Sequence, residues 1–152
     1  MRIRRFQETD ARKVVNIIRR ALLEVNSRDY PLSMLKAMCK RFTPTSIKEK
    51  AKTGHTYVAV ESNEVVGTAR LKENTISTLF ILPTKMGRGI GRRLMEQVEK
   101  KAKEDGYSFI QVPSSLTAVS FYRKMGYKKV KEVYSKEYGK NIIMKKILIL
   151  DS

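Results

Sequence analysis

The chain has 152 residues, of which 41% are hydrophobic, and this length and fraction predict one folded domain over residues 1–152 and exclude a disordered chain. No apolar run approaches the roughly 18 residues of a membrane span, and the start, "MRIRRFQETDARKVV", lacks the apolar block of a secretory signal. The single cysteine, Cys39, cannot form an internal disulfide, and from these three features together we expect a cytoplasmic protein with no membrane partner.

The first third of the chain is predicted to be helical. Residues 10–25 carry apolar side chains at helical spacing, and Asp10 is suited to the N-cap. These apolar residues are Val14, Ile17, Ile18 and Leu22. A short helix follows from about Ser33, and a third begins at Pro44 with Thr43 as its cap.

Strands and helices alternate in the rest of the chain. Strands are predicted at 55–61, 65–72, 75–83, 107–112, 127–134 and 141–148. Helices are predicted from Gly87 to about Glu104 and within 114–126, each followed by a glycine that stops it. The strand, helix and strand between 75 and 112 imply a right-handed parallel crossover, and the hairpins on either side should pair antiparallel. The expected fold class is α/β (α+β), a mixed sheet flanked by helices.

The helix from Gly87 has two distinct faces. Its apolar stripe recurs every four residues, at Ile90, Leu94, Val98 and Ala102. On the other face, Glu96 with Lys100 and Glu99 with Lys103 are spaced as favourable ion pairs, so this face is expected to be exposed.

Three glycines at alternate positions, Gly87, Gly89 and Gly91, separate the third strand from this helix in "ILPTKMGRGIGRRLM". Free amides at a helix start bind phosphate, and glycine lets the anion approach the main chain. The dinucleotide fingerprint fails because Arg92 stands where its third glycine belongs, and the P-loop spacing fails as well. We therefore expect an anion site of another kind, the alternative being a loop that needs glycine only to turn.

Two segments resemble the GNAT superfamily of N-acetyltransferases. "LFILPTKMGRGIGRRLMEQVEKKAKEDGY" is similar to its acetyl-CoA-binding segment, a strand and a proline followed by Gln/Arg-x-x-Gly-x-Gly/Ala at a helix start. Gly89 and Gly91 match the small positions, while Met86 stands where Gln or Arg is usual. "SSLTAVSFYRKMGY" resembles the downstream segment Asn-x-x-Ala-x-x-Phe-Tyr-x-Lys-x-Gly-Phe/Tyr, with Ser115 in place of Asn.

The resemblance implies a mostly antiparallel sheet of six to seven strands with a central parallel pair that splays apart, and acetyl-CoA as cosubstrate. Tyr122 would be the catalytic residue that protonates the departing thiolate, a role suited to a phenol with a pKa near ~10; the alternative is a core tyrosine. The other implied acetyl-CoA contacts are the main chain of Phe80, Ile81 and Leu82, the loop residues Met86, Gly87, Arg88, Gly89, Ile90, Gly91 and Arg92, and the side chains of Ser115 and Lys124.

The general base and the acceptor are less defined by the sequence. Between Asn74 and Pro83 there is no carboxylate, so Glu73, Glu61, Asp29, a water chain or an amine that arrives neutral remain open. The isolated His55 argues against a metal site. With few acidic side chains at 24–45 and 132–141, the acceptor is expected to be a neutral or acidic amine or a peptide.

The net charge of +17 supports an alternative of another class. A module that keeps this fold can bind CoA without catalysis, or bind nucleic acid, although no nucleic-acid motif is present. The charge can equally be a solvated surface. A homodimer is a further expectation from the family resemblance.

Overall fold

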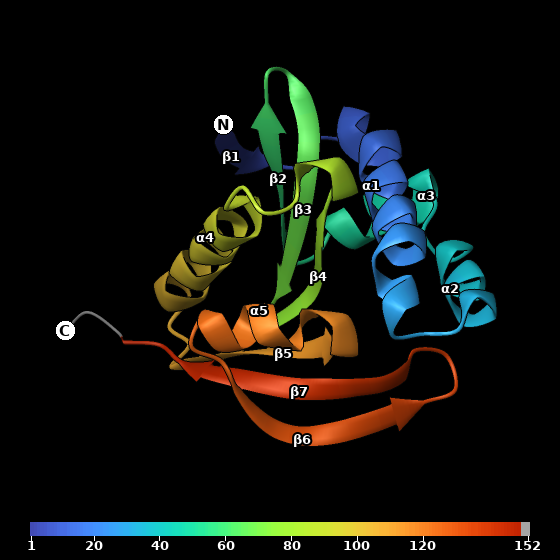
Figure 1. The fold of residues 1–152 in the computed structure, drawn as a ribbon. Helices are drawn as coiled ribbons and strands as arrows, with labels where there is room; N and C mark the ends of the chain where they lie inside the picture. Colours follow the sequence, from blue (N-terminus) through green and yellow to red (C-terminus); the bar gives the residue numbers. More distant parts are fainter. Residues whose placement is uncertain (150–152) are drawn as a thin grey trace.

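A computed structural model describes residues 1–149 and contains one seven-stranded sheet in the order β1-β2-β3-β4-β5-β7-β6 (Figure 1). The strands are β1 (Arg2–Arg5), β2 (His55–Glu61), β3 (Glu64–Lys72), β4 (Thr75–Ile81), β5 (Phe109–Ser115), β6 (Lys128–Ser135) and β7 (Gly139–Ile147). Neighbouring strands pair antiparallel except β4 and β5, which are parallel. The expected mixed sheet with a central parallel pair is confirmed.

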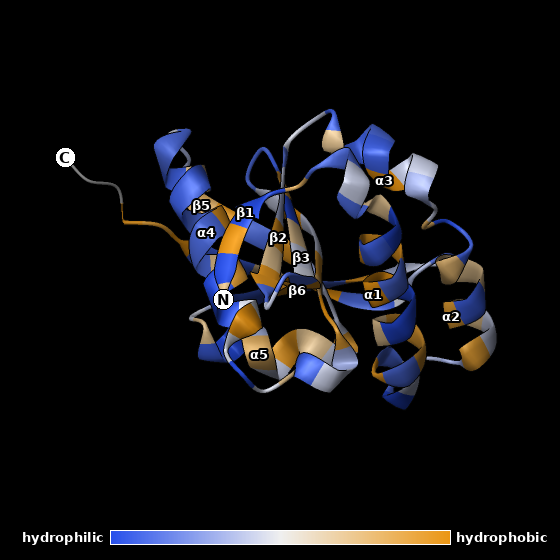
Figure 2. Ribbon diagram, turned by 90° about the horizontal axis from the view of Figure 1, so that it is seen from above, coloured by the Kyte–Doolittle hydropathy of each residue, from blue (hydrophilic) through white to orange (hydrophobic). Residues whose placement is uncertain are grey.

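Helices cover both faces of the sheet. The helices α1 (Ala11–Glu24), α2 (Leu32–Cys39) and α3 (Pro44–Ala51) lie on one face, and α4 (Ile90–Glu104) lies on the other (Figure 1). The short α5 (Val119–Lys124) follows β5 and packs beside the start of α4. Short 3₁₀ turns complete the chain at Glu8–Asp10, Asn26–Arg28, Pro83–Lys85 and Leu116–Ala118. Apolar residues of α1 and α4 face the sheet, and polar residues cover their outer sides (Figure 2).

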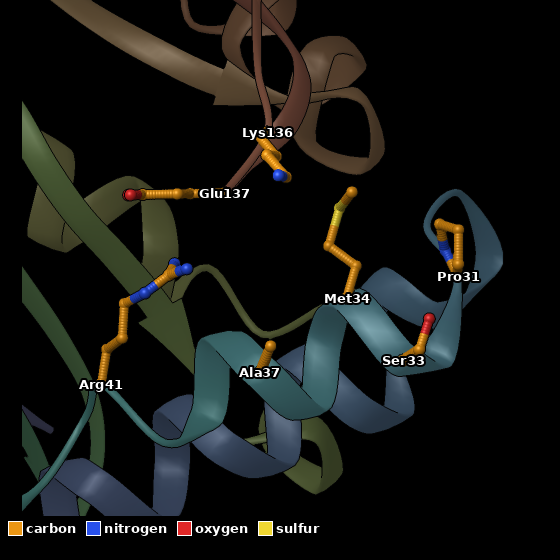
Figure 3. Close-up of a pocket in the computed structure, with 7 residues that line it drawn as sticks. All are labelled: Pro31, Ser33, Met34, Ala37, Arg41, Lys136 and Glu137. Atoms are coloured by element: carbon orange, nitrogen blue, oxygen red, sulfur yellow. The ribbon is translucent and has the colours of Figure 1, made fainter.

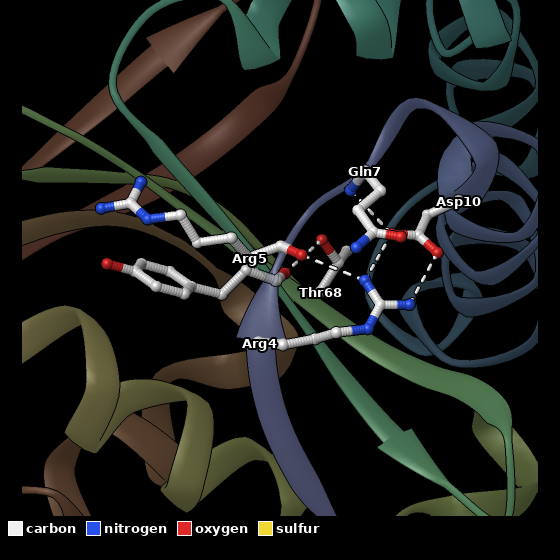
Figure 4. A network of polar contacts seen from close by, with 6 residues as sticks. Arg4, Arg5, Gln7, Asp10 and Thr68 are labelled. Atoms are coloured by element: carbon white, nitrogen blue, oxygen red, sulfur yellow. Dashed lines mark hydrogen bonds and ion pairs between the residues drawn. The ribbon is translucent and has the colours of Figure 1, made fainter.

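Strand β1 was not expected, because "RIRR" has no apolar run and no clear alternation. Its edge position is defined by pairing with β2, where Arg4 lies opposite Val58. The Arg4 guanidinium also donates to both carboxylate oxygens of Asp10, at 2.8 and 3.0 Å (Figure 4). The pairing with β2 and the contact with Asp10 hold β1 in place.

The predicted caps of the first and third helices differ in outcome. Thr43 caps α3 as expected, since its Oγ1 accepts from the amide of Ser46 at 3.1 Å and Pro44 begins the helix. Asp10 makes no side-chain cap to α1, which corrects that expectation. Its carboxylate instead binds Arg4 and accepts from the Gln7 amide at 2.8 Å, and these contacts join β1 to α1.

The apolar stripe of α4 is buried as predicted, with Ile90, Leu94, Val98 and Ala102 each at most 1% exposed. The predicted exposure of Glu99 is wrong. Its carboxylate lies at the edge of this stripe and accepts from the Tyr127 hydroxyl and from Lys146 Nζ, both at 2.8 Å. Within residues 1–149, neither Glu96 with Lys100 nor Glu99 with Lys103 forms an ion pair, because exposed pairs are weak and Glu99 is already bound.

Candidate active site

The parallel strands β4 and β5 meet at only one end. Their pairing is limited to Thr75 opposite Gln111, where the Gln111 amide donates to Asn74 O at 2.9 Å. Beyond this point β4 stays with β3 and β5 with β7, so the two strands diverge (Figure 1). Strand pairing is therefore interrupted in the middle of the sheet. We call this interruption the gap; the main-chain groups along it have no partner strand.

The alternation of β4 determines which main-chain groups face this gap. The Leu82 amide donates to Val66 O on the β3 side at 2.8 Å, and the Leu82 carbonyl accepts from the Lys85 amide at 2.8 Å. Both main-chain groups of Leu82 thus have partners within the protein, and the expected contact of Leu82 with a ligand stays a prediction. The main-chain N–H and C=O groups of successive residues in a strand point to opposite neighbours. The main-chain groups of Phe80 therefore point toward β3, like the amide of Leu82. Ile81 and Leu79, the latter missed by the sequence reasoning, face the gap.

The loop before α4 carries unpaired donors. Within residues 1–149, the amides of residues 87–92 donate no hydrogen bond to protein; the amide of Met86 contacts Pro83 O at 3.4 Å, and that of Arg93 donates to Gly89 O at 3.2 Å. Six consecutive amides at the start of a 15-residue helix are thus available to an anion. The helix itself begins at Ile90, three residues later than predicted.

Only two of the three glycines leave space for an anion. Gly87 and Gly89 have φ of +78° and +82°, and no atom lies within 4 Å of a Cβ built on either. A Cβ on Gly91 would lie 3.2 Å from the Phe121 ring, so its missing side chain lets α5 pack closely against α4. This corrects the expectation that all three glycines clear space for the ligand.

Of the carboxylates considered as general bases, Glu61 is paired and Glu73 lies away from the open end of the gap. Glu61 accepts from Arg88 Nη1 at 3.1 Å and Lys85 Nζ at 3.4 Å, so it holds the loop cations. Glu73, with φ of +56°, belongs to the turn before β4, at the end where β4 and β5 are still paired. The loop arginine Arg88 is therefore positioned by Glu61, which the sequence did not reveal.

Tyr122 lies on α5 and is 4% exposed. Its ring packs edge-on against Phe121 and Tyr127, at centroid distances of 5.2 and 5.6 Å. Among the described residues its hydroxyl has no hydrogen-bond partner, and burial raises the pKa of Tyr122. The phenol is therefore protonated at neutral pH, with its donor unused.

The remaining expected side chains border the same region. Ser115 ends β5 opposite Asn141, and within residues 1–149 its hydroxyl makes no hydrogen bond. Arg92 on α4 and Lys124 on α5 are exposed. The structure therefore places Ser115 at the end of β5, Tyr122 on α5, which follows β5, and the glycine loop between β4 and α4.

Comparisons with known proteins identify the family of this chain. Residues 26–148 match the model of the acetyltransferase (GNAT) domain. YafP of Escherichia coli K12, an uncharacterised N-acetyltransferase, is 26% identical over 132 residues, which cover 87% of this chain and 84% of YafP.

Solved structures share the fold. A GCN5-related N-acetyltransferase from Rhodopseudomonas palustris has a TM-score of 0.91 at 24% identity, covering 97% of this chain and 95% of the other. PaiA N-acetyltransferase from Thermoplasma acidophilum, solved in complex with coenzyme A, has a TM-score of 0.79 at 16% identity, with coverage of 96% and 98%. The family model spans most of the sequence, and this chain belongs to the GNAT acetyltransferase family.

Proposed function

We propose that the protein transfers an acetyl group from acetyl-CoA to a primary amine by direct attack within a ternary complex. The observation that carries this proposal is the row of six unpaired amides at residues 87–92, next to the gap between β4 and β5. Family membership supports the reaction class, and the fold is shared with PaiA of Thermoplasma acidophilum in complex with coenzyme A.

The loop fits a pyrophosphate by charge and by space. Gly87 and Gly89 leave the main chain open, and the amides of residues 87–92 add their partial charges to the helix dipole. Arg88 lies in the same loop, held by Glu61. The exposed Arg92 and Lys124 are candidates for the other phosphate of the cosubstrate.

The gap between β4 and β5 fits an extended amide-containing chain. The main chain of Leu79 and Ile81 can bond the pantetheine arm as a neighbouring strand would, since this edge of β4 is unpaired there. An amide directed into the gap would also stabilise the oxyanion that develops on the thioester carbonyl. The free hydroxyl of Ser115 borders the same gap from β5.

Tyr122 is the proposed proton donor to the departing thiolate. Burial raises its pKa, so the phenol keeps its proton over the pH range in which a thiol with a pKa near ~8.5 ionises. Within residues 1–149 the Tyr122 hydroxyl makes no hydrogen bond, so it is available to the sulfur of the departing CoA thiolate. The leaving thiolate takes the proton of Tyr122, and the attacking amine releases one proton to water as the amide forms. The tyrosinate then regains a proton from water, so the reaction has no net change in protons.

Direct attack is favoured because the cysteine of this chain is a poor acyl carrier. Cys39 is buried at the end of α2, where its Sγ lies 4.0 Å from Arg19 O. Burial raises the pKa of the Cys39 thiol, which disfavours the reactive thiolate. Because β4 carries no carboxylate, a water chain can accept the proton of the attacking amine, and an amine that arrives neutral needs no base before the attack.

The test combines binding and turnover. Wild-type protein should release heat on titration with CoA, and Tyr122→Phe should lower turnover by about 10²–10⁴-fold, as expected for the loss of a general acid. The KM for acetyl-CoA should stay unchanged, because the ring and its packing are kept. Tyr134→Phe, at an 80% exposed position on β6, is the matched control and should be silent.

Two results would overturn the proposal. Absence of CoA binding by the wild-type protein would remove the enzyme function altogether. Full turnover by Tyr122→Phe would remove this residue from the mechanism.

A further inference from the structure

We infer that the amine acceptor carries an anionic group, a carboxylate or a phosphate, and that Arg41 binds this group. The inference rests on the proposed function and concerns a cleft of about 430 Å³ between α2 and the turn joining β6 to β7. Arg41, just after α2, extends toward the hairpin, and Lys136 and Glu137 lie on the opposite wall (Figure 3).

The Arg41 side chain is half-buried, and within residues 1–149 no carboxylate pairs with it. Its Nη1 atom is shielded from solvent and has no hydrogen-bond partner among the described residues. Its Cζ lies 4.9 Å from the centroid of the Tyr138 ring, which holds the guanidinium plane. Because Arg41 lines the cleft and forms no ion pair among the described residues, its guanidinium can bind an anionic group of a ligand there. Carboxylate and phosphate oxygens are the acceptors that match the guanidinium best.

The cleft adjoins the open end of the gap between β4 and β5. On one side, the residue after Arg41 is Phe42, whose ring packs edge-on against Phe80 near the end of β4, at 6.4 Å between centroids. On the other side, the Tyr30 hydroxyl accepts from the amide of Leu116, directly after β5, at 2.8 Å. These contacts connect the chain segments beside the cleft to the ends of both strands, so we expect an acceptor in the cleft to reach the gap.

The same Tyr30 hydroxyl fixes the hairpin wall. It donates to Lys140 O at 2.6 Å, and Met34 packs so tightly on Gly139 that a Cβ there would lie 3.1 Å from its sulfur. The cleft is thus built on anchored elements, α2 and the start of β7. A preformed site of this kind can select among acceptors rather than adapt to all.

Charge and lining define the acceptor class. Arg41 and Lys136 bring two positive charges and Glu137 one negative charge, so a polycation is disfavoured. Pro31, Met34 and Ala37 add apolar surface from the start and the side of α2. The ligand that fits is an amine with an apolar body and an anionic group, such as an amino acid or a short peptide.

The experiment compares acceptors of the same carbon skeleton with and without the anionic group, and each kcat/KM is referred to the concentration of neutral amine. Thiol release from acetyl-CoA is measured with leucine and leucinamide, with Leu-Leu and its amide, and with phosphoethanolamine and ethanolamine. We expect a higher kcat/KM for the anionic member, by about 10- to 100-fold, because hydrogen bonds to charged groups are strong. The third pair shows whether phosphate substitutes for carboxylate.

Variants assign the preference to one side chain. Arg41→Met should abolish the preference for the anionic member of each pair by raising the KM for that member. The KM for the uncharged member and the KM for acetyl-CoA should stay unchanged. Arg41→Lys keeps the charge and should retain part of the preference. Lys36→Met removes one charge from the exposed side of the same helix and should have no effect. Glu137→Gln should strengthen the preference by removing a repelling carboxylate.

The inference fails if the wild-type protein shows no preference within any pair, either in turnover or in calorimetric binding of the same probes to the CoA-loaded protein. It also fails if Arg41→Met weakens both members of a pair equally. CoA binding in the same titrations tells these results apart from a failure of the proposed function.

Discussion

Replacement of Gly89 by alanine separates the ligand role of this residue from its backbone role. Gly89 has φ of +82°, and no atom lies within 4 Å of a Cβ built there, so the substitution causes strain but no clash. The left-handed conformation costs a residue with a Cβ about 1–2 kcal/mol. The smaller entropy of the unfolded chain offsets about 0.4–1 kcal/mol of this cost. We expect a net loss of about 1 kcal/mol in the free energy of unfolding, or about 2–4 °C in Tm.

Gly106 provides the matched control, because it combines the same backbone strain with the same open space. Its φ is +88°, and no atom lies within 4 Å of a Cβ built there, but it follows the opposite end of α4. Gly106→Ala should lose the same stability as Gly89→Ala. Only Gly89→Ala should also weaken CoA binding, since its new methyl group projects beside the amides of residues 87–92.

The expected loss of CoA affinity follows from the contacts that the methyl group displaces. One hydrogen bond to a charged phosphate oxygen contributes about 1.5–3 kcal/mol. Its loss corresponds to a Kd about 10- to 100-fold higher. Calorimetric titration with CoA measures the affinity, and urea unfolding of the same samples measures stability. The reasoning is refuted if Gly106→Ala weakens CoA binding as much as Gly89→Ala, or if Gly89→Ala loses stability and keeps its affinity.

Two further predictions concern titration. Burial raises the pKa of Tyr122 above the ordinary tyrosine value of 10.0, so loss of the Tyr122 proton should not reduce kcat between pH 7 and pH 10. A fall of kcat in that range that persists in Tyr122→Phe belongs to another group. A fall that disappears in Tyr122→Phe would contradict the raised pKa. Burial raises the pKa of Asp10, but the hydrogen bonds from Arg4 and the Gln7 amide outweigh this and lower it below 3.8. Its ionised form therefore stabilises the fold above pH 3.8, and this contribution is lost as the pH falls through the lowered pKa. Asp10→Asn should lower the free energy of unfolding at pH 7 by about 1–3 kcal/mol, and the difference from the wild type should shrink in urea titrations below pH 4. A stability difference between Asp10→Asn and the wild type that stays constant down to pH 2 would contradict the lowered pKa of Asp10. Glu96→Gln, at an exposed position, is the control and should leave stability unchanged.

The regular elements were predictable where local pattern and tertiary packing agree. The apolar stripe of α4 and the cap of α3 are of this kind, since each depends on residues three or four positions apart. Strand β1 was not predictable, because its four residues show no pattern and their partners, β2 and Asp10, are distant or lie beyond a turn. Glu99 was misplaced for the same reason, since its partners Tyr127 and Lys146 come from other elements.

The candidate site divides in the same way. The glycine loop was visible as a motif, and the left-handed φ of Gly87 and Gly89 is a property that the residue type itself suggests. The role of Gly91 was not visible, because the Phe121 ring against which it packs is 30 positions away in the chain. Arg41 carried no motif at all, and its buried, unpartnered Nη1 became evident only when α2 and the hairpin were placed together.

The sequence by itself determined the family, the order of most elements and the position of the glycine loop, because these depend on short-range spacing and on the conformations that glycine allows. The tertiary structure alone decided which amides stay unpaired, which carboxylates are neutralised and which cation faces a cleft. These properties depend on partners far apart in the chain, and whether a polar group is free for a ligand is known only when every neighbour has been placed.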